Sequence, residues 1–170
     1  MNIRLEKADC LLGIISDTHG LFRCEVKKLF TGVDYIIHAG DIGGIQIIHE
    51  LEKTAPVLAV TGNVDNLQIR QEYSDTAVFE TPYVRLFIVH NISMVDFDLK
   101  TAGFDCVIFG HSHQAEIKNI KDVLLLNPGS AGPRRFNLGI SVALLRINGK
   151  QLSPEIFYID DPVVIKDEIK

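Results

Sequence analysis

Five short polar clusters each come directly after an apolar run in this sequence. The clusters are Asp17-Thr18-His19, Gly40-Asp41, Gly62-Asn63-Val64-Asp65, Val89-His90-Asn91 and Gly110-His111-Ser112-His113. Carboxylate, amide and imidazole groups dominate them, and these groups bind divalent metal ions in proteins. Each motif alone is weak, because short Asp-x-His and His-x-His patterns often arise by chance. Their shared position after apolar runs is the stronger signal, and it predicts one metal site built from several loops.

The mixture of ligand types indicates a site for two divalent ions. Such a site needs oxygen and imidazole ligands, a carboxylate that bridges the ions, and open positions for water and substrate. An Asp can bridge two ions and a His cannot. Two divalent ions, two Asp and one hydroxide would carry a charge of about +1, which attracts phosphate to an otherwise acidic protein. We therefore expect a metal-dependent phosphoesterase.

The order of the clusters resembles that of the calcineurin-like metallophosphoesterase superfamily. Members of that family carry Asp-x-His, Gly-Asp, Gly-Asn-x-Asp/Glu, a single His and Gly-His-x-His in this order. The chain is most similar to the small single-domain phosphodiesterase branch, which also has the segment found here as Asn127-Pro128-Gly129-Ser130. The resemblance runs from about Leu11 to Arg135. It implies an α/β fold in which two mixed β-sheets pack as a sandwich with flanking helices, in four layers.

The resemblance also implies a role for each ligand-type residue. The first ion is expected on Asp17, His19 and His113, the second on Asn63, His90 and His111, with Asp41 as the bridge. A hydroxide between the metals would attack phosphorus in line, and Asp41, Asn63, His90 and His111 would form the catalytic group. Mn²⁺ is the expected ion, and Ni²⁺, Zn²⁺, Fe and Mg²⁺ are alternatives because mixed ligands suit several metals.

Two positions depart from the family pattern. Many members have a His in the third motif that protonates the leaving group, whereas this chain has Val64. General acid catalysis is worth about 10²–10⁴-fold, so we expect a phosphodiesterase that prefers activated leaving groups. Asn91 stands where Gly usually follows the ligand His, and Asn tolerates left-handed backbone angles better than most residues. The alternative is a catalytically weak protein-interaction scaffold of the same fold.

Other polar residues are expected to support the site or the fold. His38 lies within an apolar run just before Asp41, so it is either a core histidine or a support for the ligands. Asn127 is a second candidate support. Asp65 is expected to be the N-cap of a following helix. Arg134 and Arg135 are either a solvated cation pair or contacts to a substrate anion.

The apolar runs predict the elements that position the clusters. In the first half they alternate as strand, helix, strand, helix and strand over 11–16, 23–30, 35–39, 44–53 and 56–60. This order favours parallel pairing with right-handed crossovers. The second half is richer in strands, with a helix expected at 95–102, a type I′ turn at Asn148-Gly149, and strands over 77–80, 84–89, 104–109, 115–118, 123–126, 140–147 and 156–159.

Composition limits the remaining properties. With 170 residues, 46% of them hydrophobic, the chain suits a single domain over 1–170. The net charge of -5 disfavours nucleic acid as a partner and leaves a small phosphate ester as the expected one. Cys10, Cys24 and Cys106 have irregular spacing typical of unpaired thiols. Without a membrane-length run or signal peptide, we expect a cytoplasmic protein with no membrane partner. The oligomeric state stays open, a homo-oligomer included.

Overall fold

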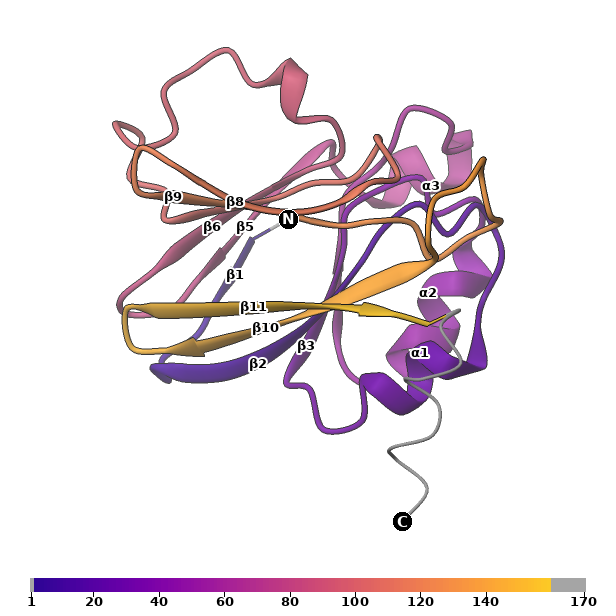
Figure 1. Cartoon of the computed structure of the whole chain (residues 1–170), viewed down its shortest axis with the longest axis horizontal. Helices are drawn as coiled ribbons and strands as arrows, with labels where there is room; N and C mark the ends of the chain where they lie inside the picture. Colours follow the sequence, from indigo (N-terminus) through magenta and orange to yellow (C-terminus); the bar gives the residue numbers. More distant parts are fainter. Residues whose placement is uncertain (1, 160–170) are drawn as a thin grey trace.

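The computed structural model describes residues 2–159, which form two mixed β-sheets (Figure 1). The five-stranded sheet has the spatial order β11 (Gln151–Tyr158), β10 (Ser141–Asn148), β2 (Asp9–Ile15), β3 (Tyr35–His38) and β4 (Val57–Ala59). The six-stranded sheet has the order β1 (Asn2–Arg4), β5 (Thr76–Glu80), β6 (Arg85–Val89), β7 (Cys106–Ile108), β9 (Val123–Pro128) and β8 (Ala115–Ile120). Each sheet combines parallel and antiparallel pairs, which confirms the predicted fold class.

Three short α-helices accompany the five-stranded sheet within residues 2–159: α1 (Cys24–Leu29), α2 (Ile45–Glu52) and α3 (Leu67–Glu72). They gather on one side of the molecule in Figure 1. The first two connect the parallel strands β2, β3 and β4, so the predicted alternation of strands and helices is confirmed. Their buried side chains pack with Phe30 on the outer face of the sheet. Gly13 permits this contact, because a Cβ there would lie 2.9 Å from the Phe30 ring.

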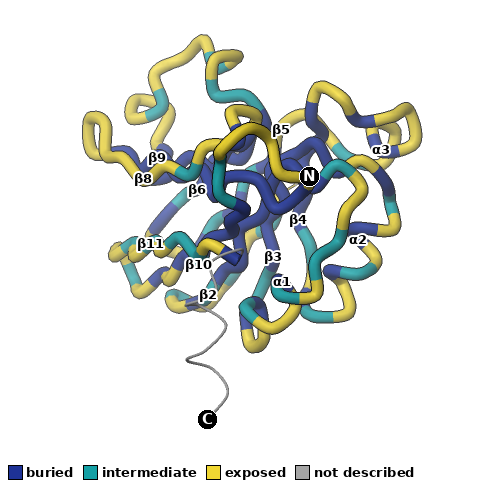
Figure 2. Tube along the Cα trace, turned by 45° about the vertical axis from the view of Figure 1, so that its right-hand side comes forward, coloured by how far each residue is buried: buried dark blue, intermediate teal, exposed yellow. Residues whose placement is uncertain are grey.

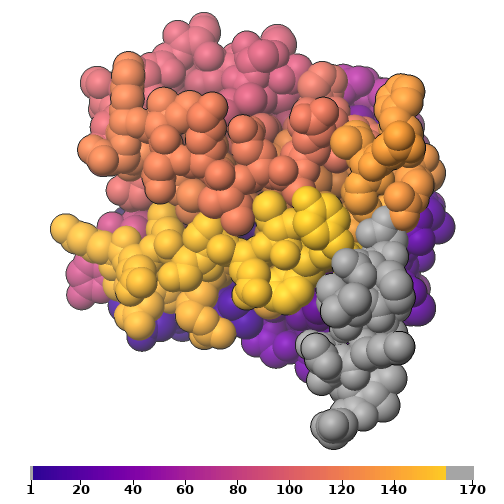
Figure 3. Space-filling view, in the orientation of Figure 1, coloured from indigo at the N-terminus to yellow at the C-terminus, as the bar shows by residue number. Residues whose placement is uncertain are grey.

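The main hydrophobic core fills the space between the two sheets. Alternate residues of β2, such as Leu12 and Ile14, face residues of the other sheet such as Ile88 and Ile108. The buried chain therefore runs through the centre of Figure 2, with exposed segments at the loop tips. On the face shown in Figure 3, residues 115–128 lie directly against residues 140–158, so the sandwich is closed along this side. Cys10 and Cys106 lie in this core, and all three cysteines are free, as predicted.

An irregular segment, rather than a helix, covers the outer face of the six-stranded sheet. After the short 3₁₀ helix η1 (Ile92–Met94), residues 95–98 have no regular structure and residues 99–102 form a turn, so the predicted helix there is wrong. Val95 and Leu99 still pack on the outer face, which explains the helix-like apolar spacing. The Asp98 carboxylate accepts a hydrogen bond from the backbone N–H of Thr101 at 2.7 Å. Such a local bond competes with helical hydrogen bonding and favours a turn.

Three further differences concern strands. β1 was not predicted, because its short polar sequence gives no apolar alternation and its partner β5 is distant in the sequence. β11 begins at Gln151, five residues before the predicted strand, and Pro154 is tolerated because β11 is an edge strand. The β10–β11 hairpin is confirmed, but Asn148 pairs with Gln151, so the turn is Gly149-Lys150. Of these two, Gly149 alone has positive φ, so the predicted type I′ geometry is wrong.

Within residues 2–159, none of the helices has both the length and the apolar character needed to cross a membrane. The predicted single domain over 1–170 includes residues 1 and 160–170, which lie outside the described residues.

Candidate metal centre

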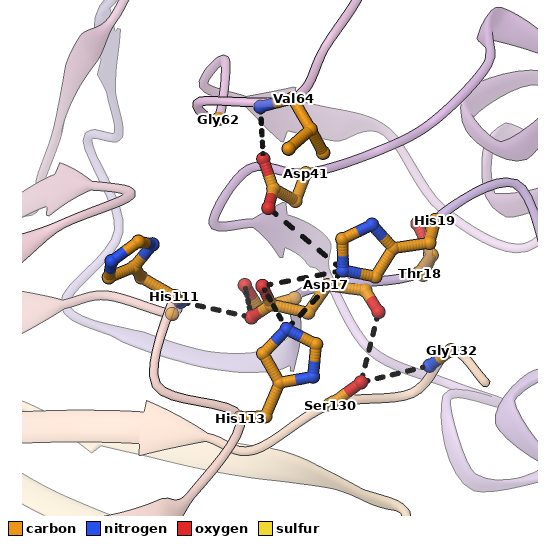
Figure 4. A network of polar contacts seen from close by, with 12 residues as sticks. Asp17, Thr18, His19, Asp41, Gly62, Val64, His111, His113, Ser130 and Gly132 are labelled. Atoms are coloured by element: carbon orange, nitrogen blue, oxygen red, sulfur yellow. Dashed lines mark hydrogen bonds and ion pairs between the residues drawn. The ribbon is translucent and has the colours of Figure 1, made fainter. Parts of the chain in front are cut away.

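The seven predicted ligands lie at one end of the two sheets, each shortly after a strand. Asp17 and His19 follow β2, Asp41 follows β3 and Asn63 follows β4, whereas His90 follows β6 and both His111 and His113 follow β7. The carboxyl ends of parallel strands share an edge, which brings residues distant in the sequence together. Figure 4 shows Asp17, His19, Asp41 and His113 directed toward one another from three loops, with the backbone N–H of His111 directed at Asp17. The clusters identified in the sequence therefore form one site.

A first group of ligand atoms comes from Asp17, His19 and His113. The Nε2 atoms of the two histidines lie 3.3 Å apart, and their rings stack with centroids 5.2 Å apart. The Asp17 Oδ1 atom is 3.3 Å from His113 Nε2 and 4.0 Å from His19 Nε2. Two imidazole nitrogens and one carboxylate oxygen thus face a common point, an arrangement that suits a divalent cation.

A second group lies on the other side of Asp41. The Asp41 Oδ2 atom is 3.3 Å from His90 Nε2 and 3.9 Å from His19 Nε2, so one carboxylate reaches toward both groups. The Asn63 Oδ1 atom is 3.1 Å from His90 Nε2 and 3.0 Å from His111 Nδ1. The Asp17 carboxylate also lies close enough to Asp41 and His90 to share a cation with them. The two groups therefore overlap through their carboxylates.

The orientation of His90 tests whether a cation fits the second group. Its Nδ1–H donates to the carbonyl oxygen of Ala39 at 2.8 Å, so Nε2 of the neutral ring carries a lone pair. That lone pair faces the oxygens of Asp41 and Asn63. A proton on His90 or a metal ion among these atoms would stabilise the arrangement. Although burial disfavours the charged ring, the hydrogen bond with Asp41 raises the pKa of His90.

Asp17 gives a second test of fit. The residue is fully buried, and its Oδ2 atom accepts hydrogen bonds from Ser16 Oγ at 2.7 Å and from the backbone N–H of His111 at 3.1 Å. Its Oδ1 atom is buried without any hydrogen-bond donor. Burial raises the pKa of this carboxyl to about 6. A buried acceptor that lacks a donor is costly, so a cation at Oδ1 fits the residues present.

The remaining ligand candidates have protonation states that suit metal binding. Burial, Arg135 and His19 together lower the pKa of His113 to about 4. Burial also lowers the pKa of His19. Burial alone would raise the pKa of Asp41, but hydrogen bonds from His90 and from the backbone N–H of Val64 bring it to about 2. At neutral pH these groups are neutral imidazoles and a carboxylate, which are the metal-binding forms.

The backbone around these ligands is unusual. Positive φ angles occur at Asp17 (55°), His19 (47°), Asp41 (53°), His111 (69°) and His113 (59°). Left-handed backbone is uncommon for residues other than glycine, and such residues cluster at functional sites. Five of the seven predicted ligands therefore have left-handed backbone.

Glycines let the loops approach closely enough to form the centre. Gly40 has φ of +89°, and a Cβ there would lie 2.7 Å from Nδ1 of the His90 ring. At Gly110 a Cβ would lie 1.9 Å from Ser16 Oγ and 2.6 Å from the Asp17 carboxylate. Both positions therefore exclude any side chain larger than hydrogen. The glycines that begin the second and fifth clusters thus have a packing role at the centre.

His38 and Asn127, the two predicted supports, contact the ligand loops rather than the common point. His38 is fully buried, and its Nε2 atom lies 2.9 Å from Thr18 Oγ1, which itself donates to the carbonyl oxygen of Ile42. His38 Nε2–H is therefore the donor in this pair, and burial lowers the pKa of the ring to about 4. Asn127 Nδ2 donates to the Gly110 carbonyl oxygen at 2.9 Å and to Ser112 Oγ at 3.0 Å. Each residue fixes one ligand loop.

The predicted capping role of Asp65 is wrong. The N-cap of α3 is Asn66, whose side chain accepts from the backbone N–H of Ile69 at 3.1 Å. Asp65 is buried and precedes this N-cap by one residue. Its carboxylate accepts from the backbone N–H groups of Gly43 and Gly62, both at 2.8 Å. Asp65 therefore ties the loop that carries Asp41 to the loop that carries Asn63.

Two arginines contribute to the site. Arg70 was not identified in the sequence, because an arginine on a helix after a turn carries no signature. Its guanidinium donates to the carbonyl oxygens of Gly62, Asn63 and Asp65, which fixes the turn bearing Asn63. The Nη2 atom of the exposed Arg135 lies 3.4 Å from His19 Nε2. Arg135 therefore reaches the centre.

Val64 and Asn91, the two positions that depart from the family pattern, differ in their contacts with the site. Val64 donates its backbone N–H to Asp41 Oδ1 at 3.0 Å, while its side chain is 56% exposed at the rim of the site. Asn91 has a φ of −114°, so this position does not use the left-handed geometry that we expected it to tolerate. Its side chain accepts from the backbone N–H of Ser93 and caps η1.

Comparisons with known proteins agree with the site. The profile of the calcineurin-like phosphoesterase superfamily domain matches residues 11–150. The chain is 36% identical over 165 residues to a probable metallophosphoesterase of Methanothermobacter thermautotrophicus, covering 90% of this chain and 95% of that protein.

Solved structures show the same fold. An archaeal phosphodiesterase has a TM-score of 0.72 at 26% identity, covering 86% of this chain and 98% of that one. Vps29 from Entamoeba histolytica, in a complex with zinc, has a TM-score of 0.74 at 24% identity, covering 89% of this chain and 94% of that one. The resemblance first drawn from five polar clusters is confirmed, and the chain belongs to the calcineurin-like phosphoesterase superfamily.

Proposed function

We propose that this protein is a phosphodiesterase that uses two divalent metal ions. The observation that carries the proposal is the position of Asp41, whose Oδ2 atom lies between His19 at 3.9 Å and His90 at 3.3 Å. Because one carboxylate reaches both ligand groups, two ions could share it. The buried Asp17 Oδ1 atom without a donor supports the same proposal.

The proposed ligands follow from the two groups. Asp17, His19 and His113 would hold the first ion, Asn63, His90 and His111 would hold the second, and Asp41 would contact both. We propose Mn²⁺ as the ion, with Ni²⁺, Zn²⁺, Fe and Mg²⁺ as alternatives for a mixed oxygen and nitrogen site. When bound, the ions would supply an activated water and offset the negative charge of the phosphate.

The protein's own residues would orient and neutralise the substrate. Arg135, beside His19, offers a guanidinium to the phosphate oxygens. Asp17 and Asp41 are the two carboxylates among the proposed ligands, so their negative charge does not outweigh that of two divalent cations. Val64 contributes no side-chain proton at the rim. We therefore propose that esters with good leaving groups, such as aryl diesters, react fastest.

The proposal is tested by Asp41→Asn together with a metal titration. Wild-type protein should bind two equivalents of Mn²⁺ by calorimetry and hydrolyse bis(p-nitrophenyl) phosphate. Removing one ligand charge should lower kcat/KM by roughly 10²-fold or more. Replacing a residue that only supports a metal ligand already lowers metal affinity or activity by about 10–100-fold. Asp105→Asn is a matched control, because Asp105 also accepts a backbone hydrogen bond but lies away from the centre. Undiminished turnover and metal binding in Asp41→Asn would contradict the two-ion site.

A catalytically weak scaffold of the same fold is the second candidate. The exposed aliphatic side chain of Val64, at the rim where a proton donor would serve catalysis, is the observation in its favour. The metal titration separates the two candidates. Two tightly bound equivalents with turnover support the enzyme, whereas failure to bind a second ion and absence of turnover would support the scaffold.

A further inference from the structure

A pocket of about 480 Å³ opens beside the second ligand group. Asn63 and His90 form part of its lining, so the pocket is continuous with the candidate metal centre. Its volume falls within the range typical of small-molecule sites. A molecule whose phosphate lies at the centre would therefore extend its organic part into this pocket.

One wall of the pocket is apolar and well fixed. Phe87 and Val89 come from β6, Met94 comes from η1, and Phe97 comes from the irregular segment after η1. The Phe97 ring packs edge-on against Phe87, with centroids 5.6 Å apart. We call these four residues the apolar wall. It forms a preorganised surface for a ring or a similar apolar group.

The apolar wall leaves hydrophobic side chains in contact with water. Met94 is 76% exposed and Phe97 is 44% exposed, although neighbouring residues of the same segment pack onto the sheet. The capped turn η1 fixes Met94 in this position, and it begins directly after the ligand His90 through Asn91. Exposed apolar groups that line a pocket indicate a binding surface rather than a packing defect.

Two charged residues of the pocket lining already form hydrogen bonds within the protein. Arg70 donates to the carbonyl oxygens of Gly62 and Asn63, and Asp75 accepts from Thr61 Oγ1 at 2.6 Å. These charged groups therefore stabilise the pocket, and the apolar wall provides the main contact area for a ligand. An uncharged ring suits this lining better than a charged or sugar group.

We propose that the pocket binds an uncharged, ring-sized apolar group of the substrate ester, so that the substrates are hydrophobic phosphodiesters. The inference rests on the proposed function, because it places the phosphate of the same ester at the metal centre. Recognition then comes from two adjoining parts: the centre binds the phosphate, and the apolar wall selects the organic group.

The experiment compares phenylphosphonate with methylphosphonate as ligands of the Mn²⁺-loaded protein. The two anions share one head group and differ in a single organic group, so the ratio of their dissociation constants reports on the pocket. Burying the ring should make phenylphosphonate bind about tenfold more tightly or better, measured by calorimetry. Met94→Ala and Phe97→Ala should each reduce this preference to about threefold or less while methylphosphonate affinity and metal content stay unchanged.

Tyr83→Ala is the matched control. Tyr83 is 53% exposed in the turn between β5 and β6, at the end of β6 opposite to His90. Its removal should leave the phenyl preference intact. Met94→Ala keeps the test decisive even if Phe97→Ala disturbs folding, because the Met94 side chain is mostly exposed.

Each outcome has a distinct meaning. Equal affinities of the wild-type protein for the two phosphonates would overturn the inference and leave the proposed function standing. A phenyl preference that survives in both wall variants would also overturn the inference. Binding of neither phosphonate, together with no turnover of an aryl diester, would overturn the proposed function itself.

Discussion

At the scale of single residues, Val64 contacts the proposed metal centre through its backbone and not through its side chain. Its backbone N–H helps to hold Asp41, whose pKa lies near 2, while its side chain is 56% exposed at the rim. The residue therefore serves the centre through the backbone alone. A larger side chain at position 64 could be accommodated toward solvent without disturbing Asp41.

Val64→His should extend the substrate range. An imidazole at the rim could protonate a departing alkoxide, so kcat/KM for diesters with alkyl leaving groups should rise about tenfold or more, within the range of general acid catalysis. Diesters with p-nitrophenyl leaving groups should change little, because they need no proton. The dependence of rate on leaving-group pKa should become shallower than in wild type. Val64→Gln is the control for size, and an equal gain with Gln would argue against proton donation.

At the scale of elements, the centre depends on how closely the ends of strands approach one another. The loop after β3 can lie against the His90 ring because residue 40 lacks a side chain. Gly32, in the loop before β3, has a similar φ of +83° but open space around its Cα. The two glycines therefore differ in packing while sharing backbone geometry.

Gly40→Ala and Gly32→Ala form a matched pair. Both introduce a Cβ into left-handed backbone, which costs about 1–2 kcal/mol. Gly40→Ala also displaces the His90 ring, so it should cost about 1–3 kcal/mol more and weaken Mn²⁺ binding, whereas Gly32→Ala should leave binding intact. Urea unfolding and calorimetric titration measure the two effects. Equal destabilisation with normal metal binding in both variants would contradict the role assigned to Gly40.

The local structure of the elements also explains which of them the sequence could predict. Strands such as β2 and β3 were predictable because each is a compact apolar run followed by a polar cluster. The irregular structure at 95–102 was not, because Val95 and Leu99 have helical spacing while the Asp98 side chain forms a local bond that ends the helix pattern. The ligand types were visible in the sequence. The hydrogen bonds from Arg70 to the backbone carbonyls of Gly62 and Asn63 were not visible, because they depend on the three-dimensional fold.

At the scale of the whole molecule, buried titratable groups link the site to stability. His38 is fully buried with a pKa of about 4, compared with 6.5 in the unfolded chain. The folded state therefore binds fewer protons than the unfolded state between these values. His38 contributes full stability above pH 6.5, and this contribution is lost as the pH falls toward 4. The difference corresponds to on the order of 3 kcal/mol.

His38→Gln should flatten the acid limb of the stability profile. Glutamine keeps an N–H donor for Thr18 but does not titrate, so the metal-free variant should lose less stability than wild type between pH 7 and pH 4.5. The measurement is chemical unfolding across this range in the presence of a chelator. His49→Gln, on the exposed face of α2, is the control and should follow wild type. Identical profiles for wild type and His38→Gln would contradict the assignment. The raised pKa of Asp17 has the opposite effect on stability at low pH. Because Asp17 is present in both proteins, the comparison between wild type and His38→Gln isolates the contribution of His38.

The left-handed backbone at Asp17, His19, Asp41, His111 and His113 has a consequence for engineering this protein. Each of these residues adopts a conformation that glycine would adopt at lower conformational cost. A library screened only for survival after heating would therefore tend to accumulate glycine at exposed positions such as His111. Such a screen would remove a proposed metal ligand while the stability of the fold increased, so heat resistance and Mn²⁺ binding should be selected together.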